Sequence, residues 1–368
     1  MLTSNRRYDI DWIRVIAIGL LLIYHVAIAF QPWGVMIGFI ANKNPWEALW
    51  IPMMMLNVWR IPLLFFVSGM GVYFALQQRD WKQLIGERAR RILLPFLVGI
   101  FLIVPIHIYI WHDYYNLKFS YPNHPGHLWF LGNIFVYVLV LSPLFFFLKR
   151  NSEGRIVAGI KRILSHPLGL LAVIFAFIVE GLAVQPNPYE LYALTWHGFF
   201  LGLLAFFFGY CFVLSGRSFW DNVLRWRWLF LSVATTLFTI RITQFPQYAP
   251  RYVYFLVTES QCWIFTVFAF GYKYLNQPSR LLRYLSEAAY PVYILHMVFL
   301  YLACVLIFPL EVSPPVQFIL VLMFTIVGCF AAYELIRKVN PIRPLFGLKW
   351  ERAAKDKKFV ALQNSQGD

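Results

Sequence analysis

Two ionisable residues, Arg14 and His25, interrupt the first apolar stretch of the chain. Eleven steps of about 100° return a helix to within roughly 20° of its starting direction, so both side chains share one helix face. At 1.5 Å rise per residue they are separated by roughly 16 Å along that face. An ionisable side chain in a spanning helix is costly and usually faces a cavity or the bundle interior. The pair therefore predicts a polar passage, with a cation near one membrane face and an imidazole deeper in the membrane.

The two residue types suit group-transfer chemistry. A neutral imidazole can take a proton from an attacking hydroxyl group, and a guanidinium binds phosphate or carboxylate oxygens. Each residue also has a structural interpretation that the sequence leaves open. His25 could hydrogen-bond a neighbouring helix, and Arg14 could reach the interface and pair with Asp11 three positions earlier.

The composition is that of a membrane protein. The chain has 368 residues, of which 60% are hydrophobic and 13% charged, whereas soluble domains have about 45–50% apolar and about 25% charged residues. The mean hydropathy is +0.62. Apolar windows predict an all-α, polytopic fold with ten spans. We place these spans at 10–31, 47–76, 92–111, 127–148, 167–185, 195–215, 226–243, 252–275, 288–308 and 315–336.

The predicted domain organisation is simple. We expect one transmembrane domain over residues 1–346 and a charged cytoplasmic tail over residues 347–368. The second window is long enough for one tilted helix, or for a short re-entrant segment followed by a helix. The pair Ser68-Gly69 in that window would let another helix approach closely.

The formal net charge of +15 comes from basic residues gathered in alternate loops. The N-terminal segment and the loops after the second, fourth, sixth, eighth and tenth spans carry most of the Lys and Arg. The positive-inside rule then places both termini in the cytoplasm, and this pattern indicates topology rather than nucleic-acid binding. The four cysteines lie in apolar runs, where we expect buried thiols and no disulfide. No histidine or cysteine group has metal-ligand spacing, so no metal site is predicted.

Further charged residues fall inside the predicted spans. Arg60 in the second span needs a counter-charge or a bound anion, and we expect an ion pair with Glu259 or Glu180. Glu180 and Arg241 form another candidate pair. His127 stands at the start of the fourth span, near the predicted outer interface.

Four segments resemble motifs of the membrane-bound acyltransferase-3 family, and they occur in that family's order. Asp11 to His25 is similar to its opening motif of Arg or Lys, ten residues and His. Arg60 to Gly69 resembles its second-span motif, and His127 to Leu131 its fourth-span opening. Ser286 to His296 resembles its late motif of Ser, Tyr-Pro, Tyr and His. The chain is most similar to the stand-alone branch that includes the glucan succinyltransferases of osmoregulated periplasmic glucan synthesis.

The resemblance implies an inner-membrane O-acyltransferase. Such an enzyme moves a short acyl group from cytoplasmic acetyl-CoA, succinyl-CoA or a similar acyl-CoA to a hydroxyl of a glycan or other acceptor on the outer side. His25 matches the family's essential histidine and Arg14 its essential cation. We expect catalytic roles for His25, Arg14, Arg60, Tyr290 and Ser286, acyl-CoA contacts from Arg14, Arg88, Arg90 and Arg91, and acceptor contacts from His127, Glu180, Glu259 and His296.

In the mechanism that we expect, His25 is the general base and Arg60, Tyr290 or Ser286 donates to the tetrahedral oxyanion. A covalent acyl-histidine remains an alternative. A transporter or channel using intramembrane His, Arg and Glu is the competing class, although the sequence shows no paired broken helices. An N-acyltransferase acting on an aminosugar is a third option. The expected partners are the lipid bilayer and a small-molecule acceptor, without nucleic acid, and the oligomeric state stays open, a homodimer being one option.

Overall fold

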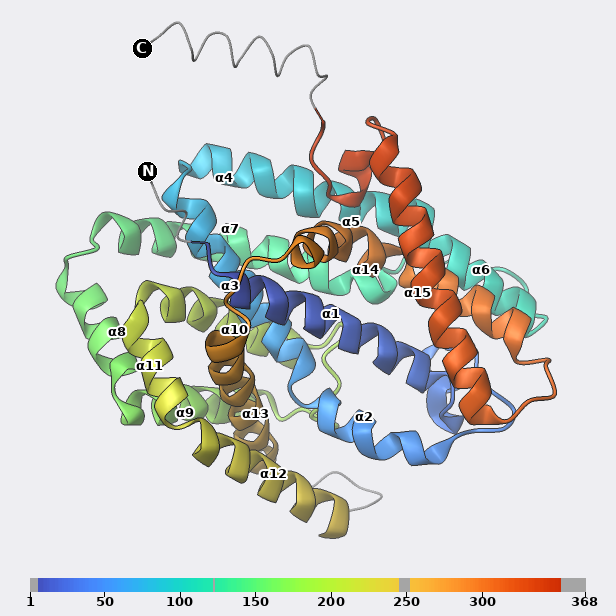
Figure 1. Ribbon diagram of the computed structural model, residues 1–368, viewed down its shortest axis with the longest axis horizontal. Coiled ribbons are helices and arrows are strands. Elements are labelled where there is room, and N and C mark those ends of the chain that lie inside the picture. The colour runs from blue at the N-terminus through green and yellow to red at the C-terminus, as the bar shows by residue number, and fades with distance from the viewer. Residues whose placement is uncertain (1–5, 122, 245–251, 352–368) are drawn as a thin grey trace, which may run out of the picture.

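The structure is a computed structural model that describes residues 6–121, 123–244 and 252–351. The described part consists of helices and short helical turns joined by loops (Figure 1). Within it, nine helical segments are long and apolar enough to cross a membrane. A tenth arises if α11 (Arg217–Arg225) and α12 (Arg227–Gln244), which meet at 56°, form one span. The predicted all-α fold with about ten spans is confirmed.

The helices lie close to the predicted windows. The first span is α1 (Tyr8–Ile28), and the long second window contains α2 (Trp50–Asn57) followed by α3 (Arg60–Gln77). The second window is therefore a short helix plus a longer one. The other long helices are α7 (Trp129–Arg150), α9 (Pro167–Val184), α10 (Trp196–Leu214), α13 (Val253–Tyr274), α14 (Arg280–Ile307) and α15 (Pro314–Lys338), and shorter pieces are α8 (Arg155–Ser165), η1 (Pro32–Ile37), η2 (Glu47–Leu49), η5 (Gly126–Leu128) and η6 (Arg343–Phe346).

The third span is one continuous helix with two π-helical turns. It comprises α4 (Trp81–Arg88), η3 (Ala89–Leu93), α5 (Leu94–Val98), η4 (Gly99–Ile103) and α6 (Val104–Tyr114). A proline follows each π-helical turn by two residues. Because proline lacks an N–H and its ring clashes with the carbonyl four residues earlier, a widened turn relieves that clash. The predicted basic loop after the second span is therefore largely helical.

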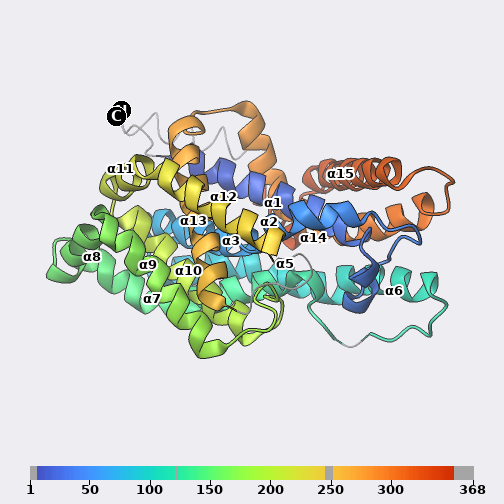
Figure 2. The same cartoon turned by 90° about the horizontal axis from the view of Figure 1, so that it is seen from below.

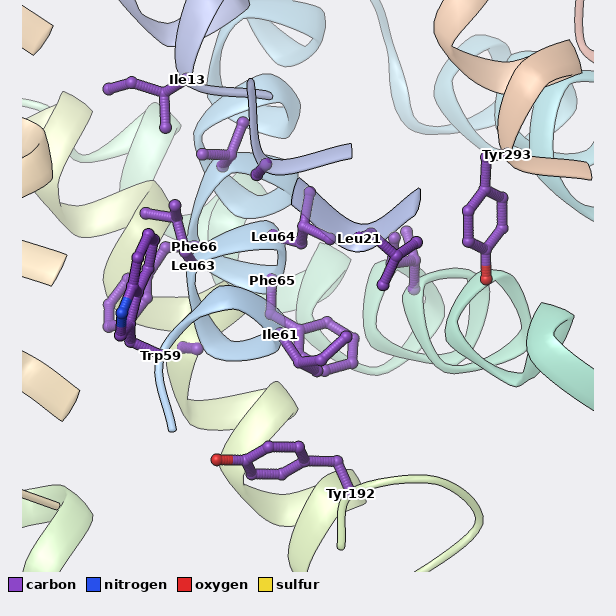
Figure 3. Packing of buried hydrophobic residues seen from close by; sticks show 14 of the residues in the cluster. Ile13, Leu21, Trp59, Ile61, Leu63, Leu64, Phe65, Phe66, Tyr192 and Tyr293 are labelled. Atoms are coloured by element: carbon purple, nitrogen blue, oxygen red, sulfur yellow. The ribbon is translucent and has the colours of Figure 1, made fainter. Parts of the chain in front are cut away.

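Helix α1 runs through the bundle, and it packs against α3, α13, α14 and α15. Both views show α6 and α15 extending to one side of the molecule, with α8 and α11 at the opposite side (Figures 1 and 2). The core between α1 and α3 is aliphatic and aromatic, as Figure 3 shows for Leu21, Leu64 and Phe65.

The tightest helix contact joins α3 to α10. A Cβ atom added to Gly69 would lie 1.9 Å from the carbonyl oxygen of Phe206, and one added to Gly209 would lie 2.0 Å from that of Phe66. Each glycine thus lets the facing backbone approach to a distance that any side chain would prevent. The predicted close approach at Ser68-Gly69 is confirmed.

The chain beyond the last span folds back onto the helices. Leu348 is buried, the guanidinium of Arg343 donates to the carbonyl of Lys349 at 2.7 Å, and the Glu351 N–H donates to Asn340 Oδ1 at 2.8 Å. Residues 347–351 therefore pack on the transmembrane domain. The rest of the predicted tail, 352–368, lies outside the described residues.

Candidate active site

A cavity of about 1760 Å³ lies between helices that are far apart in the sequence. Its walls come from α1, α2, α3, α6, η5, α13, α14 and the loop over residues 185–193. The walls are mostly aromatic and aliphatic. The basic and amide side chains among the wall residues include His25, Asn57, Arg60, His107, His124 and His127.

His25 is hydrogen-bonded to a second histidine. Its Nδ1 lies 2.8 Å from Nε2 of His296, and the two rings are nearly parallel, with an interplanar angle of 15°. His296 is fully buried, and its Nδ1 lies 2.6 Å from the carbonyl oxygen of Tyr293. His25 lines the cavity whereas His296 stands behind it. Of the two, only His25 is placed to meet a ligand in this cavity.

His127 joins η5 to α14 through two reciprocal hydrogen bonds. Its Nε2 lies 3.1 Å from the carbonyl oxygen of Ile294, and the Tyr293 hydroxyl donates to the carbonyl of His127. Figure 3 shows the Tyr293 hydroxyl pointing toward the ribbon of α7, which follows η5. The ring of His107 packs against His127 with centroids 5.4 Å apart. Although four histidines gather here, no His, Cys, Asp or Glu group in the described ranges is arranged to hold a metal ion.

Arg60 begins α3 and is 5% exposed. Its Nη2 donates to Asn57 Oδ1 at 3.1 Å, and its Cζ lies 3.4 Å from the centre of the Tyr24 ring. Its Nε and Nη1 have no hydrogen-bond partner among the described residues. A buried guanidinium on a cavity wall with free N–H groups is equipped to bind an anion.

The expected ion pair of Arg60 with Glu259 or Glu180 is wrong. Glu259 accepts two hydrogen bonds from Arg241, at 2.7 and 2.9 Å, and Glu180 accepts one from His197 Nδ1 at 3.0 Å. The candidate pair of Glu180 with Arg241 is wrong for the same reason. Neither carboxylate is among the cavity-lining residues, so the structure places both predicted acceptor contacts in buried networks beside the cavity.

The loop after α9 forms a cavity wall that the sequence reasoning missed. Glu190 Oε1 lies 3.6 Å from Arg241 Nη1, and the Tyr192 hydroxyl donates to the carbonyl of Val58 at 3.1 Å. Burial raises the pKa of the Glu190 carboxyl, against the opposing charge of Arg241. The sequence does mark this loop as unusual. Its segment 186–192 contains two prolines and two tyrosines, a composition that could have indicated a structured wall.

A second polar cluster surrounds Tyr290. The side chains of Arg88, Arg14 and Arg91 lie near this half-buried tyrosine, and Arg88 and Arg91 pair with Glu87 at 3.3 and 3.2 Å. We call Arg14, Arg88, Arg91 and Tyr290 the basic cluster. The hydroxyl of Ser286, one helical turn before Tyr290, is buried without a partner among the described residues. Arg90 is exposed and is not part of this group.

Arg14 does not line the cavity that His25 lines, although the predicted passage would require both side chains on its wall. The α1 residues on the cavity wall begin at Leu21, and Arg14 instead pairs with Asp11 at 2.8 Å, as in the structural interpretation. Helix α14 carries residues of both groups. Tyr290 of the basic cluster and His296 of the histidine pair lie six residues apart on this helix, which is roughly 9 Å along its axis and about 120° around it.

Comparison with known protein families identifies the family to which the chain belongs. No curated protein and no solved structure shows a significant match to the chain. A family model described as an acyltransferase domain matches residues 7–334, which include the cavity, the histidine pair and the basic cluster. The chain therefore belongs to the acyltransferase-3 family and is a multi-pass membrane acyltransferase.

Proposed function

We propose that this acyltransferase moves a short acyl group, acetyl or succinyl, from acyl-CoA to a hydroxyl of a carbohydrate held in the cavity. The observation that carries the proposal is the imidazole of His25 on the cavity wall, backed by His296. Aromatic side chains make up much of the wall, including Trp33, Trp50, Trp111 and Trp129. Such rings suit the apolar faces of sugar rings, while the histidines and Arg60 meet polar groups.

His25 removes the proton from the acceptor hydroxyl as its oxygen attacks the thioester carbonyl. The new C–O bond forms, the C–S bond breaks, and the proton passes from His25 to the leaving coenzyme A thiolate. General-base assistance of this kind contributes typically about 10²–10⁴ in rate. Arg60 is the candidate oxyanion donor that lines the cavity, since Tyr290 and Ser286 lie outside it.

The donor is held by the basic cluster, which we place on the cytoplasmic side from the positive-inside rule. Arg14, Arg88 and Arg91 match the negative charge of the coenzyme A phosphates. The pantetheine arm follows the α14 face past Tyr290 and Tyr293. None of the basic-cluster residues lines the described cavity, so the arm has to bridge the distance between the two sites.

The proposal is tested by mass spectrometry of surface glycans from a deletion strain complemented with single variants. His25→Ala and Arg14→Ala should insert normally and leave the glycans without the acyl group, since one lacks the base and the other a donor contact. His166→Ala, an exposed histidine on the loop before α9, is the matched control and should restore acylation. Full acylation by His25→Ala would exclude the general-base role, and thioester-independent substrate flux in liposomes would favour a transporter.

A further inference from the structure

The hydrogen bonds behind His25 define which of its ring nitrogens carries a proton. A carbonyl oxygen only accepts, so His296 Nδ1, 2.6 Å from the Tyr293 carbonyl, carries a hydrogen. In a neutral imidazole the second nitrogen is then an acceptor. Nε2 of His296 therefore accepts a hydrogen bond from Nδ1–H of His25, 2.8 Å away. The remaining nitrogen of His25, Nε2, keeps its lone pair.

The surroundings favour a neutral His296. Its side chain is fully buried and is contacted by the rings of His25, His127 and Tyr293. No carboxylate in the described part of the chain bonds to His25 or His296. An isolated imidazolium buried there would be costly, whereas a neutral imidazole satisfies both of its nitrogens.

We propose that His296 is a positioning residue that holds His25 in the tautomer with Nδ1 protonated and Nε2 free. The proposal rests on the proposed role of His25 as the base. The hydrogen bond made by one ring nitrogen sets the protonation of the other, and it also fixes the ring orientation. If the proton moved to Nε2, the nitrogen available to the acceptor hydroxyl would no longer be able to take a proton.

Neighbouring contacts keep His296 itself in place. The Tyr293 carbonyl orients its ring, and the Tyr293 hydroxyl anchors the same turn of α14 to the carbonyl of His127. His127 in turn donates from Nε2 to the carbonyl of Ile294. This turn of α14 is therefore tied to η5 in both directions, which limits rotation of the helix face that carries His296.

The tautomer is measured directly by nitrogen NMR of protein labelled with ¹⁵N-histidine, because protonated and bare ring nitrogens resonate at well-separated shifts. His25→Ala and His296→Leu assign the two sets of signals. We expect Nδ1 of His25 to be protonated and Nε2 bare in the wild-type protein. A proton on Nε2 of His25 would overturn the inference whatever the enzyme's activity.

Variants at His296 test the consequence for turnover, measured as thiol release from acetyl-CoA and from succinyl-CoA by reconstituted protein. His296→Leu should lower kcat by about 10²–10⁴-fold, because general-base assistance is lost. The KM for acetyl-CoA or succinyl-CoA should change little. His296→Gln should recover most of this loss, since its amide oxygen can accept from His25. The double variant with His25→Ala should be no slower than His25→Ala alone, because the two residues act as a unit.

Leu300→Ala is the control for helix packing. Leu300 is buried on the same helix but does not line the cavity, so its loss should leave the His25 tautomer unchanged. If His296→Leu retains full kcat while His25→Ala is inactive, only the positioning role fails. If His25→Ala is itself active, the proposed function fails, and the two outcomes are thereby distinguished.

Discussion

Arg241 and Arg60 are both buried, but only the charge of Arg241 is compensated by a carboxylate among the described residues. Arg241 is 1% exposed and makes a two-point ion pair with Glu259, so its charge is compensated within the fold. Arg60 is almost as deeply buried, but among the described residues its guanidinium hydrogen-bonds only Asn57, and it stacks on Tyr24. A fold gains little from an uncompensated buried cation, so its presence on a cavity wall is best explained by a ligand or transition state.

Replacing each arginine by Met should therefore give opposite results. Arg241→Met strands the Glu259 carboxylate and should cost about 3–5 kcal/mol of stability. Arg60→Met removes a charge without a counter-charge, so its melting temperature should stay near that of the wild type while kcat falls by about 10²–10³-fold. Thermal unfolding measures the stability of both variants, and thiol release from acetyl-CoA measures their kcat. A melting point for Arg60→Met as low as that of Arg241→Met would show that Arg60 is structural.

The sequence predicted the relative positions of site residues only where those residues lie on the same helix. Arg14 and His25 share a helix face whatever surrounds them, and the late Ser-to-His segment places Tyr293 and His296 on another face. Ion pairs between helices depend on how segments distant in the sequence pack together, and helix periodicity does not predict that packing. The expected ion pair of Arg60 was wrong for this reason. Tyr24 was missed because an aromatic residue in an apolar span looks the same in the sequence whether it faces a cavity, the core or lipid.

At the level of helices, the position of Arg60 depends on the contact between α3 and α10. Gly69 and Gly209 bring the two backbones together, and α3 begins at Arg60 itself. The windows of apolar residues predicted where these helices lie, and Ser68-Gly69 predicted that one neighbour comes close. The identity of that neighbour could not be predicted, because the other half of the contact, Gly209, lies about 140 residues later.

Gly69→Ala should disturb this contact, since its Cβ would sit 1.9 Å from a backbone oxygen that cannot rotate away. We expect a loss of about 1–3 kcal/mol from the forced separation of the helices. Gly71→Ala is the matched control on the same helix, with no atom within 4 Å of the added Cβ, and it should be neutral or stabilising by about 0.5–1 kcal/mol. Equal melting temperatures for the two variants would contradict the proposed packing.

At the scale of the whole molecule, the proposed function assigns the donor and the acceptor to different sites. The basic cluster and the cavity lie at different depths along α1 and α14, and Tyr290 and His296 are roughly 9 Å apart along the axis of α14. The last turn of the described chain covers one side of the basic cluster, where a Cβ on Gly347 would lie 3.1 Å from both the Tyr290 ring and the Arg91 carbonyl. In the proposed function, this separation lets the enzyme bind a donor that cannot cross the membrane and an acceptor that arrives from the other side.

The separation predicts that coenzyme A binding and catalysis respond to different residues. Free coenzyme A at 100 times its Kd should stabilise the wild-type protein by about 2.7 kcal/mol, measured as a rise in melting temperature in detergent. Arg88→Ala and Arg14→Ala should abolish most of that rise, because they remove charges from the basic cluster. His25→Ala and Arg60→Met should keep it, because both residues line the cavity and not the basic cluster. A shift that depends on Arg60 but not on Arg88 would instead place the coenzyme in the cavity and reverse the assignment of the two sites.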